Sequence, residues 1–311
     1  LTKFLELLKK IRWAVHKNIF NGWLLVNKPA GITSADVVRV LKRKMNPTKI
    51  GHAGTLDPDA TGLIPLALGE ATKAIPYLLK SKKKYEATFL YGVKTDTDDA
   101  SGNALKASFY VPRKNEILDA LNYYSEVIFQ IPPKVSAVKV EGKRAYKRFK
   151  ANENFQLSAR SIKVYELSLQ SYDESGKAIV HFECSKGGYV RSIARDIGDF
   201  IGCFGYVRKL SRLEYGPFKV TEACHLPKLL DFSIESLESN LKAIEIGIPN
   251  LKIFECPMDD LKQLENGHPI ECPTTVSLIE GEELIAKYKG RVAAILFKDG
   301  SFLKVRRKLN T

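Results

Sequence analysis

One carboxylate in the sequence stands out as a group that could do chemistry, Asp57 within residues 51–62, GHAGTLDPDATG. This segment combines three glycines, two threonines, a proline and two aspartates, a composition that favours a tightly shaped loop. Pro58 biases Asp57 toward an extended backbone, and amide donors of the same loop could hold its side chain. Such a loop could aim a nucleophile, and an ordinary Asx turn would explain the same residues, so both interpretations stay open here.

The sequence lacks the patterns of several other kinds of catalytic site. Residues 94–102, KTDTDDASG, gather three aspartates, but Ala100 stands where a calcium-binding loop needs Asp or Asn. There is no H-E-x-x-H, no G-x-S-x-G elbow and no Walker A motif. The five cysteines form no C-x-x-C pair, which argues against a zinc site or a disulfide framework and favours a reducing cytoplasm. Catalysis is therefore expected to need neither a metal nor an organic cofactor.

The charge balance of the chain favours a polyanion as partner. Lys and Arg number 49 against 35 Asp and Glu, which gives a net charge of +14 and a pI near 9.4. Basic residues also stand beside aromatic ones, in residues 82–85, in residues 139–146 and at Tyr189 with Arg191, which suits phosphate contact beside base stacking. A solvated basic face with buried tyrosines would give the same pattern, and a basic balance also keeps a protein soluble. Nucleic acid is the partner that the charge indicates.

The elements expected around Asp57 mix strands, hairpins and helices. Strands are predicted from residue 22 to the turn at residues 29–31, over residues 82–95, and as hairpins over residues 161–185 and 290–307; helices are predicted over residues 35–45, 114–127 and 190–202. This mixture has no regular βαβ alternation. It therefore predicts an α+β fold with a mostly antiparallel sheet.

The length of 311 residues favours two domains. Residues 1–21 are interpreted as an N-terminal extension, in which residues 4–17 could form a short helix that docks or frays, with a membrane-surface or targeting role as the alternative. Residues 22–250 form the first domain and end in a connecting stretch, residues 226–250. Residues 251–311 form a small second domain of short strands. No apolar stretch approaches the roughly 18 residues that a membrane span needs.

Six segments, taken in order, resemble the TruB family of bacterial tRNA pseudouridine synthases. They cover about residues 22–218 and read GWLLVNKPAGITS, KIGHAGTLDPDATGLIPLALGEATK, KKKYEATFLYGVKTDTDDASG, IPPKVSAVKVEGKRAY, CSKGGYVRSIARDIG and KLSRLEYGPF. The resemblance implies the pseudouridine synthase fold with a mostly antiparallel mixed sheet, followed by a small β-rich, PUA-like RNA-binding domain. It also implies the reaction, in which uridine 55 in the T arm of tRNA is flipped out and isomerised through an aspartate-dependent rearrangement of its glycosidic bond.

The resemblance assigns roles to four residues of a candidate pocket. Asp57 matches the catalytic aspartate of the family. Tyr85 matches the tyrosine that stacks on the target base and is a candidate for proton transfer, and Tyr189 matches a second pocket tyrosine. Arg191 matches an arginine that pairs with the aspartate, and such a pairing is expected to keep a partly desolvated carboxylate ionised and in position.

Three further residues are assigned to the surroundings of this pocket. Leu210 matches an apolar wall, His52 matches a histidine that occupies space in the opened T loop, and Lys28 matches a lysine that supports the fold near the site. Ala53 and Gly188 depart from the threonine expected at both positions. The loss of a side chain at Gly188 predicts a looser pocket edge.

The resemblance further implies a monomeric cytoplasmic enzyme that acts on tRNA without a cofactor, a membrane or an obligate protein partner. Two alternatives remain, a non-catalytic RNA-binding protein that remodels T arms and a guide-dependent enzyme that modifies ribosomal RNA. The combination of Asp57, Tyr85 and Arg191 disfavours the first alternative. The sequence shows no long basic tail or extra segment for the partners of a guide complex, which disfavours the second.

Overall fold

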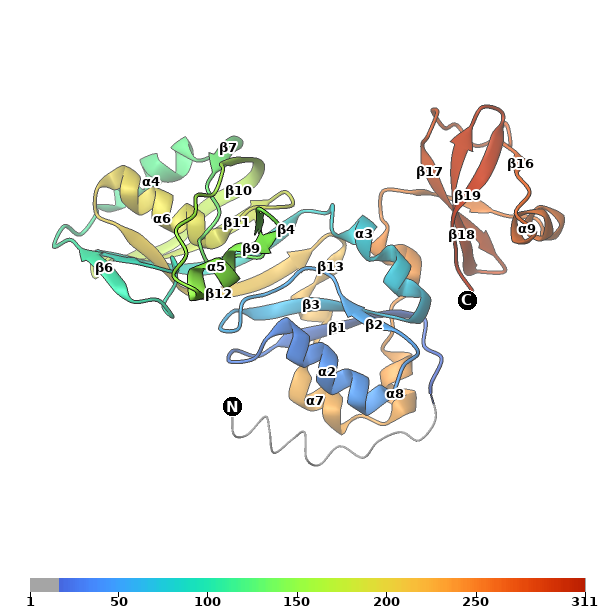
Figure 1. The fold of residues 1–311 in the computed structure, drawn as a ribbon, viewed down its shortest axis with the longest axis horizontal. Coiled ribbons are helices and arrows are strands. Elements are labelled where there is room, and N and C mark those ends of the chain that lie inside the picture. Colours follow the sequence, from blue (N-terminus) through green and yellow to red (C-terminus); the bar gives the residue numbers. More distant parts are fainter. Residues whose placement is uncertain (1–16, 311) are drawn as a thin grey trace.

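The computed structural model describes residues 17–310, which form two large β-sheets and two two-stranded ones, with helices packed around them (Figure 1). The combination of helices with sheets confirms the predicted α+β class. The helix predicted over residues 4–17 lies, apart from Lys17, outside the described residues. Within residues 17–310, no helix combines the length and the apolar character needed to cross a membrane.

The larger sheet has ten strands and carries the predicted site. Eight of them follow the order β14-β1-β3-β12-β4-β11-β10-β7, while β13 pairs with β12 and β2 pairs with β3. The pairs β1–β14 and β3–β12 are parallel and the others are antiparallel, which confirms the mostly antiparallel mixed sheet. The strands are β1 Gly22–Lys28, β2 Ile50–His52, β3 Thr61–Leu68, β4 Lys83–Tyr91, β7 Val127–Gln130, β10 Arg160–Asp173, β11 Lys177–Cys184, β12 Gly205–Tyr215, β13 Phe218–Lys219 and β14 Cys224–His225.

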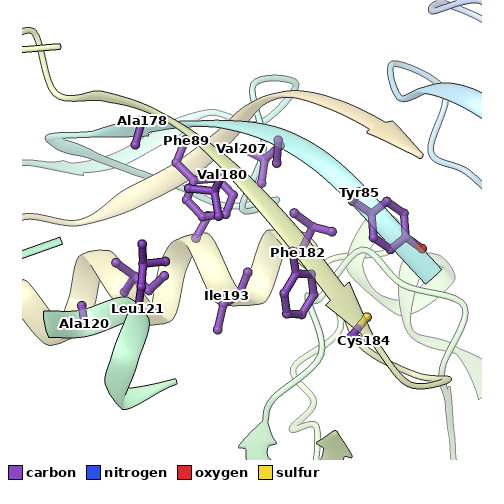
Figure 2. Packing of buried hydrophobic residues seen from close by; sticks show 14 of the residues in the cluster. Tyr85, Phe89, Ala120, Leu121, Ala178, Val180, Phe182, Cys184, Ile193 and Val207 are labelled. Carbon is purple, nitrogen blue, oxygen red and sulfur yellow. The ribbon is translucent and has the colours of Figure 1, made fainter. Parts of the chain in front are cut away.

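Two helices, α4 (Lys114–Tyr123) and α6 (Val190–Ile201), pack on one face of this sheet (Figure 1). Alternate residues of a strand point to the same face, so Phe89 of β4 and Phe182 of β11 both reach the core beneath α6. They belong to one buried cluster with Ile193 of α6 (Figure 2). Full burial of each such side chain is worth about 1.5–3 kcal/mol. The packing therefore fixes α6 against the strands that flank the site.

Helix α4 is shorter than predicted. The sequence predicted a helix over residues 114–127, whereas α4 ends at Tyr123 and Val127 begins β7. Glu126 has a φ of 66°, a left-handed conformation that no α-helix continues through. Val127 pairs with Lys163 of β10, so the sheet edge recruits residues whose local pattern is compatible with a helix.

The prediction of a connecting stretch at residues 226–250 is wrong. These residues form α7 (Leu226–Asp231), α8 (Ile234–Ser239) and the 3-10 helix η3 (Ile244–Gly247). Leu229 and Leu237 are completely buried in the cluster that also covers the predicted helix at residues 35–45, present as α2 (Ser34–Met45). Helices of four to six residues are too short to show helical periodicity, so the sequence pattern alone resembled a linker.

The smaller sheet lies in the C-terminal part of the chain and has the order β15-β17-β18-β19-β16 (Figure 1). The predicted hairpin at residues 290–307 is confirmed as β18 and β19, which pair in antiparallel fashion. This sheet confirms a small β-rich domain, and its first strand begins at Lys252. The elements of this part are β15 Lys252–Glu255, α9 Met258–Glu265, β16 Ile270–Glu271, β17 Glu283–Tyr288, β18 Arg291–Asp299 and β19 Phe302–Lys308. The remaining short elements are η1 Gly69–Ala74, α3 Ile75–Leu78, β5 Val93–Thr95, β6 Ala104–Ala107, β8 Lys139–Val140, β9 Lys143–Arg144, α5 Ala145–Lys150 and η2 Val220–Glu222.

Candidate active site

Asp57 lies in the loop between β2 and β3, and its neighbours in sequence hold that loop in place. The hydroxyl of Ser34, at the start of α2, accepts a hydrogen bond from the Leu56 amide at 2.9 Å and donates one to the Leu56 carbonyl at 3.1 Å. On the other side, the carbonyl of Pro58 accepts a hydrogen bond from the amide of Gly31 at 3.0 Å. The residues before and after Asp57 are therefore both anchored, and the loop presents the carboxylate in a defined direction.

Lys28 is a completely buried cation beneath this loop. Its ammonium group donates to the carbonyls of Ile32 and Pro58, both at 2.8 Å, and to that of Pro29 at 3.0 Å. Burial lowers the pKa of Lys28 to about 8, although nearby carboxylates, including Asp57, act in the opposite direction. Lys28 thus ties the end of β1 to the residue that follows Asp57.

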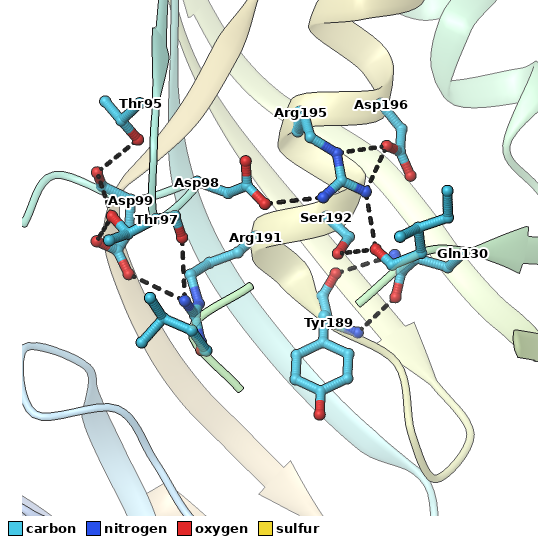
Figure 3. Close-up of polar contacts among 12 residues, drawn as sticks. Thr95, Thr97, Asp98, Asp99, Gln130, Tyr189, Arg191, Ser192, Arg195 and Asp196 are labelled. Atoms are coloured by element: carbon cyan, nitrogen blue, oxygen red, sulfur yellow. Dashed lines mark hydrogen bonds and ion pairs between the residues drawn. The ribbon is translucent and has the colours of Figure 1, made fainter. Parts of the chain in front are cut away.

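Arg191, in the first turn of α6, pairs with Asp57. Its Nε lies 3.0 Å from Oδ2 of Asp57, and the arginine side chain is only 5% exposed. The rest of the guanidinium group donates to the carbonyls of Thr97 at 3.0 Å and Val135 at 2.9 Å, and it lies 3.4 Å from a carboxylate oxygen of Asp99 (Figure 3). Four separate contacts therefore fix the orientation of the arginine that faces Asp57.

The surroundings of Asp57 act on its carboxyl in two directions. Its side chain remains 42% exposed, yet desolvation by the surrounding protein is the largest effect and raises the pKa of Asp57 above its ordinary value. Arg191 opposes this shift, and the nearby charge of Asp99 adds to it. Arg191 does favour the ionised carboxylate, as expected, but desolvation outweighs it and the net shift of the Asp57 pKa is upward.

A small cavity of about 100 Å³ brings most of the predicted residues together. Asp57 and Arg191 form part of its wall, together with Tyr85, Tyr189 and Leu210. Tyr85 is 7% exposed, and burial raises its pKa to about 12, so its phenol is neutral at physiological pH. The arrangement places a charged carboxylate beside two aromatic rings and an apolar wall.

A second cavity of about 190 Å³ borders the same ion pair. Asp57, Arg191 and Leu210 line both cavities, while Asp99 and Lys209 belong to the second alone. Asp57 consequently borders both cavities.

The backbone of Tyr189 is held by Gln130. The side-chain amide of Gln130 donates to the carbonyl of Tyr189 at 3.0 Å and accepts from its amide at 2.8 Å (Figure 3). Gln130 is the last residue of β7, so the edge of the sheet determines where α6 begins. Tyr189 in turn borders the cavity.

Two of the predicted site residues, His52 and Lys28, line neither of these cavities. His52 ends β2 and is half-buried, and burial followed by the nearby charge of Arg212 lowers its pKa. Arg212 is itself buried, donating to the carbonyls of Leu63 at 2.7 Å and Gly54 at 3.0 Å. Sequence reasoning missed this arginine, although its position two residues after Leu210 in a strand indicated the same face of the sheet.

The two departures from the family pattern have different surroundings. Ala53 is fully buried in an apolar cluster. A Cβ atom at Gly188 would lie 2.6 Å from the sulfur of Cys184. The sulfur therefore occupies part of the space that a side chain at Gly188 would need, and this side of the cavity is filled.

The fold is similar to that of chains in two solved assemblies. A chain of the crystal structure of a Cbf5–Nop10–Gar1 complex matches with a TM-score of 0.72 at 20% identity, over 96% of this chain and 92% of that one. A chain of an H/ACA RNP bound to a substrate RNA containing 2′-deoxyuridine matches with a TM-score of 0.71 at 20% identity, over 93% and 85%. At this identity the likeness shows the fold alone. The likeness extends over both sheets of the chain, and the C-terminal sheet forms a PUA-like domain.

Sequence comparison identifies the family. The model of the N-terminal domain of the TruB family of pseudouridylate synthases matches residues 42–190. The tRNA pseudouridine synthase B of Ruegeria pomeroyi is 40% identical over 283 residues, covering 90% of this chain and 93% of that protein. The same enzyme of Roseobacter denitrificans is 40% identical over 289 residues, covering 92% and 95%. The chain therefore belongs to the TruB family of pseudouridine synthases, which confirms the resemblance found in the sequence.

Proposed function

We propose that this protein isomerises uridine 55 in the T arm of tRNA to pseudouridine. The observation that carries the proposal is the ion pair of Asp57 and Arg191 in the wall of a cavity that Tyr85, Tyr189 and Leu210 also line. Relatives that are 40% identical are named tRNA pseudouridine synthase B, which supports tRNA as the substrate. The net charge of +14 suits a polyanionic substrate.

Entry into the cavity requires the uridine to leave its stack. Unstacking costs a few kcal/mol, because a base inside the arm hides its glycosidic bond. Stacking on an aromatic ring returns roughly 1–3 kcal/mol, and Tyr85 is the ring that we assign to it. With a pKa of about 12, Tyr85 holds its proton at neutral pH, which favours stacking over removal of a proton.

Asp57 is the residue to which we assign the chemistry. The bond between C1′ and N1 breaks, the detached uracil turns, and C5 bonds to C1′. C5 then gives up its proton and N1 takes one up, so the product is an isomer of the substrate. Attack on C1′ and removal of the C2′ proton both need an ionised carboxylate, so Asp57 acts as an anion in either route. Arg191 orients it through Nε and favours its charged form.

The remaining residues support this centre in our proposal. Leu210 is the apolar wall against which the base rests. Lys28 holds the backbone carbonyl of Pro58 and thereby the course of the catalytic loop. His52 lies outside both cavities, at the edge of the opened arm. We further propose that the enzyme works in the cytoplasm as a monomer.

The test is to incubate a T-arm transcript with the purified protein and to map pseudouridine. We expect modification of uridine 55, no product with Asp57→Asn, and product with Asp59→Asn, which removes an equal charge from the same loop. Full activity of Asp57→Asn would overturn the assigned mechanism. Binding of the transcript without product would instead establish an RNA-binding protein.

A second experiment separates unaided action from guide-dependent action. A bare stem-loop of about 17 nucleotides, given without any guide RNA or added protein, contains the substrate that the proposal requires. Product on this stem-loop supports unaided recognition of tRNA. Product that appears only after a guide RNA is added would contradict it.

A further inference from the structure

Three consecutive lysines, Lys82, Lys83 and Lys84, stand at the start of β4, and the middle one differs from its neighbours. Lys82 pairs with Glu183 at 2.8 Å, and Lys84 pairs with Glu166 at 2.6 Å. Among residues 17–310, no carboxylate forms an ion pair with Lys83. Two of the three charges are thus compensated within the protein, and one is not.

Lys83 is half-buried in surroundings that do not favour a positive charge. Its ammonium group donates to the carbonyl of Ser81 at 3.0 Å and lies 4.4 Å from the centre of the Tyr215 ring. Burial lowers the pKa of Lys83 to about 8, although Cys184 acts in the opposite direction. Arg212 and Lys186, both cations, add to the lowering. An anion beside this ammonium group would remove the penalty.

One neighbour of Lys83 places it beside the catalytic cavity. Cys184 of β11 is its partner in the strand pairing, and the Cys184 sulfur lies 2.6 Å from the Cβ position of Gly188, which lines the cavity. Figure 2 shows Cys184 at the same end of the sheet as Tyr85, which follows Lys83 by two residues and shares its strand face.

The other neighbour leads to the opposite margin of that cavity. Tyr215 lies under the ammonium group of Lys83, and its ring carbon Cε1 is 2.8 Å from the Cβ position of Gly54. Gly54 precedes Thr55, which lines the cavity on the side of the catalytic loop. Lys83 itself lines neither cavity, but its two neighbours contact residues on two sides of the catalytic one.

We propose that Lys83, with Lys186 beside it, binds a backbone phosphate of the RNA next to the nucleotide that enters the cavity. The proposal rests on the proposed function, because a flipped nucleotide carries its flanking phosphates toward the cavity. Lysine suits this task because its ammonium group is a point charge that can donate hydrogen bonds to phosphate oxygens. Lys186 is exposed and, within residues 17–310, has no ion pair. Phosphate binding would compensate the charge that the protein leaves uncompensated at Lys83.

The experiment compares Lys83→Gln with Lys82→Gln, which removes an equal charge from the adjacent residue. The Kd for a T-arm RNA is measured over a series of salt concentrations. We expect Lys83→Gln to raise Kd by about tenfold at low salt and to reduce the slope of log Kd against log salt by about 1. Lys82→Gln, whose charge Glu183 already compensates, is expected to change Kd by less than about threefold.

A thermal unfolding measurement distinguishes this role from a structural one. Lys83→Gln removes an uncompensated cation, so we expect Tm to stay unchanged or to rise while RNA affinity falls. Equal effects of the two substitutions on Kd, or a lower Tm with an unchanged salt slope, would overturn the phosphate site. The Kd is measured without turnover, so the two proposals can fail separately. If Lys83→Gln loses affinity while the wild-type protein makes no pseudouridine, the phosphate site is supported and the proposed function is rejected.

Discussion

At the scale of the residue, the site depends on a carboxylate whose surroundings both raise and lower its pKa. Asp57 is expected to act in its charged form, and desolvation raises its pKa above the ordinary value near 3.8. Arg191 limits that rise. The balance of the two effects sets the pH below which the enzyme stops working.

We expect kcat to fall on the acidic side as Asp57 takes up a proton. Because the carboxyl is active when ionised and its pKa is raised, the acidic limb of the profile should lie above pH 3.8. Arg191→Gln removes the opposing charge, so it should lower kcat by roughly 100-fold and move the limb to higher pH. The measurement is single-turnover pseudouridine formation between about pH 4 and pH 8. A limb that stays in place would show that another group controls the profile.

Lys28 offers a second test at this scale. Lys28→Met leaves three carbonyl groups without their shared donor, so we expect a loss of about 3 kcal/mol in the free energy of unfolding. Lys42→Met changes an exposed lysine of α2 and should cost less than about 0.5 kcal/mol. Urea denaturation measures both, and equal midpoints for the two variants would refute the structural role of Lys28.

At the scale of the element, α6 holds two separate segments around the site. One turn after Arg191, the guanidinium group of Arg195 contacts Asp98 at 2.8 Å and donates to the carbonyl of Ile131 at 2.8 Å (Figure 3). Asp98 follows Thr97, whose carbonyl accepts from Arg191. The helix thereby fixes the loop that in turn orients the arginine facing Asp57.

Arg195→Gln leaves the mostly buried carboxylate of Asp98 without its arginine. We expect a loss of about 3 kcal/mol in stability and a drop in kcat of roughly tenfold, because Thr97 is no longer held in position. Arg39→Gln breaks a pair in which the arginine is 65% exposed and should cost less than about 1 kcal/mol. Adding Asp98→Asn to Arg195→Gln should restore part of the stability, since it removes the unpaired charge. Denaturation curves and single-turnover rates of these variants are the measurements.

At the scale of the whole molecule, the two sheets share one apolar cluster. Ile295 of the smaller sheet belongs to the same cluster as Trp23 and Leu63 of the larger one. Polar contacts also connect the C-terminal sheet to the rest of the chain, among them the ion pair of Lys287 with Glu245 at 2.8 Å. A shared core of this kind favours unfolding as one cooperative unit.

We expect residues of both sheets to unfold in a single calorimetric transition. Ile295→Ala should lower stability by about 2–5 kcal/mol and shift that whole transition, because Ile295 is completely buried. Ile253→Ala, at a position that is 54% exposed, is the matched control and should have little effect. Two resolved transitions, with only one of them shifted by Ile295→Ala, would show that the sheets are independent.

The sequence by itself determined the chemistry-bearing motifs, the class of fold and the longer elements. The three glycines and one proline of residues 51–62 indicated a shaped loop, and periodicity and terminal residues indicated α2 and α6. Local propensity decides such features, so they can be predicted from the sequence alone. The family resemblance added the pairing of Asp57 with Arg191, two residues that lie far apart in the chain.

Only the tertiary structure decided which groups surround that pair. Arg212, Ser34 and Gln130 support the site through contacts across the sheet, and no local pattern marks a residue whose partner is distant in sequence. Residues 226–250 have the sequence pattern of a linker, but in the structure they form short helices with a face buried in the core. The direction of the Asp57 pKa shift has the same origin, because desolvation depends on everything that packs around a group rather than on its neighbours in the chain.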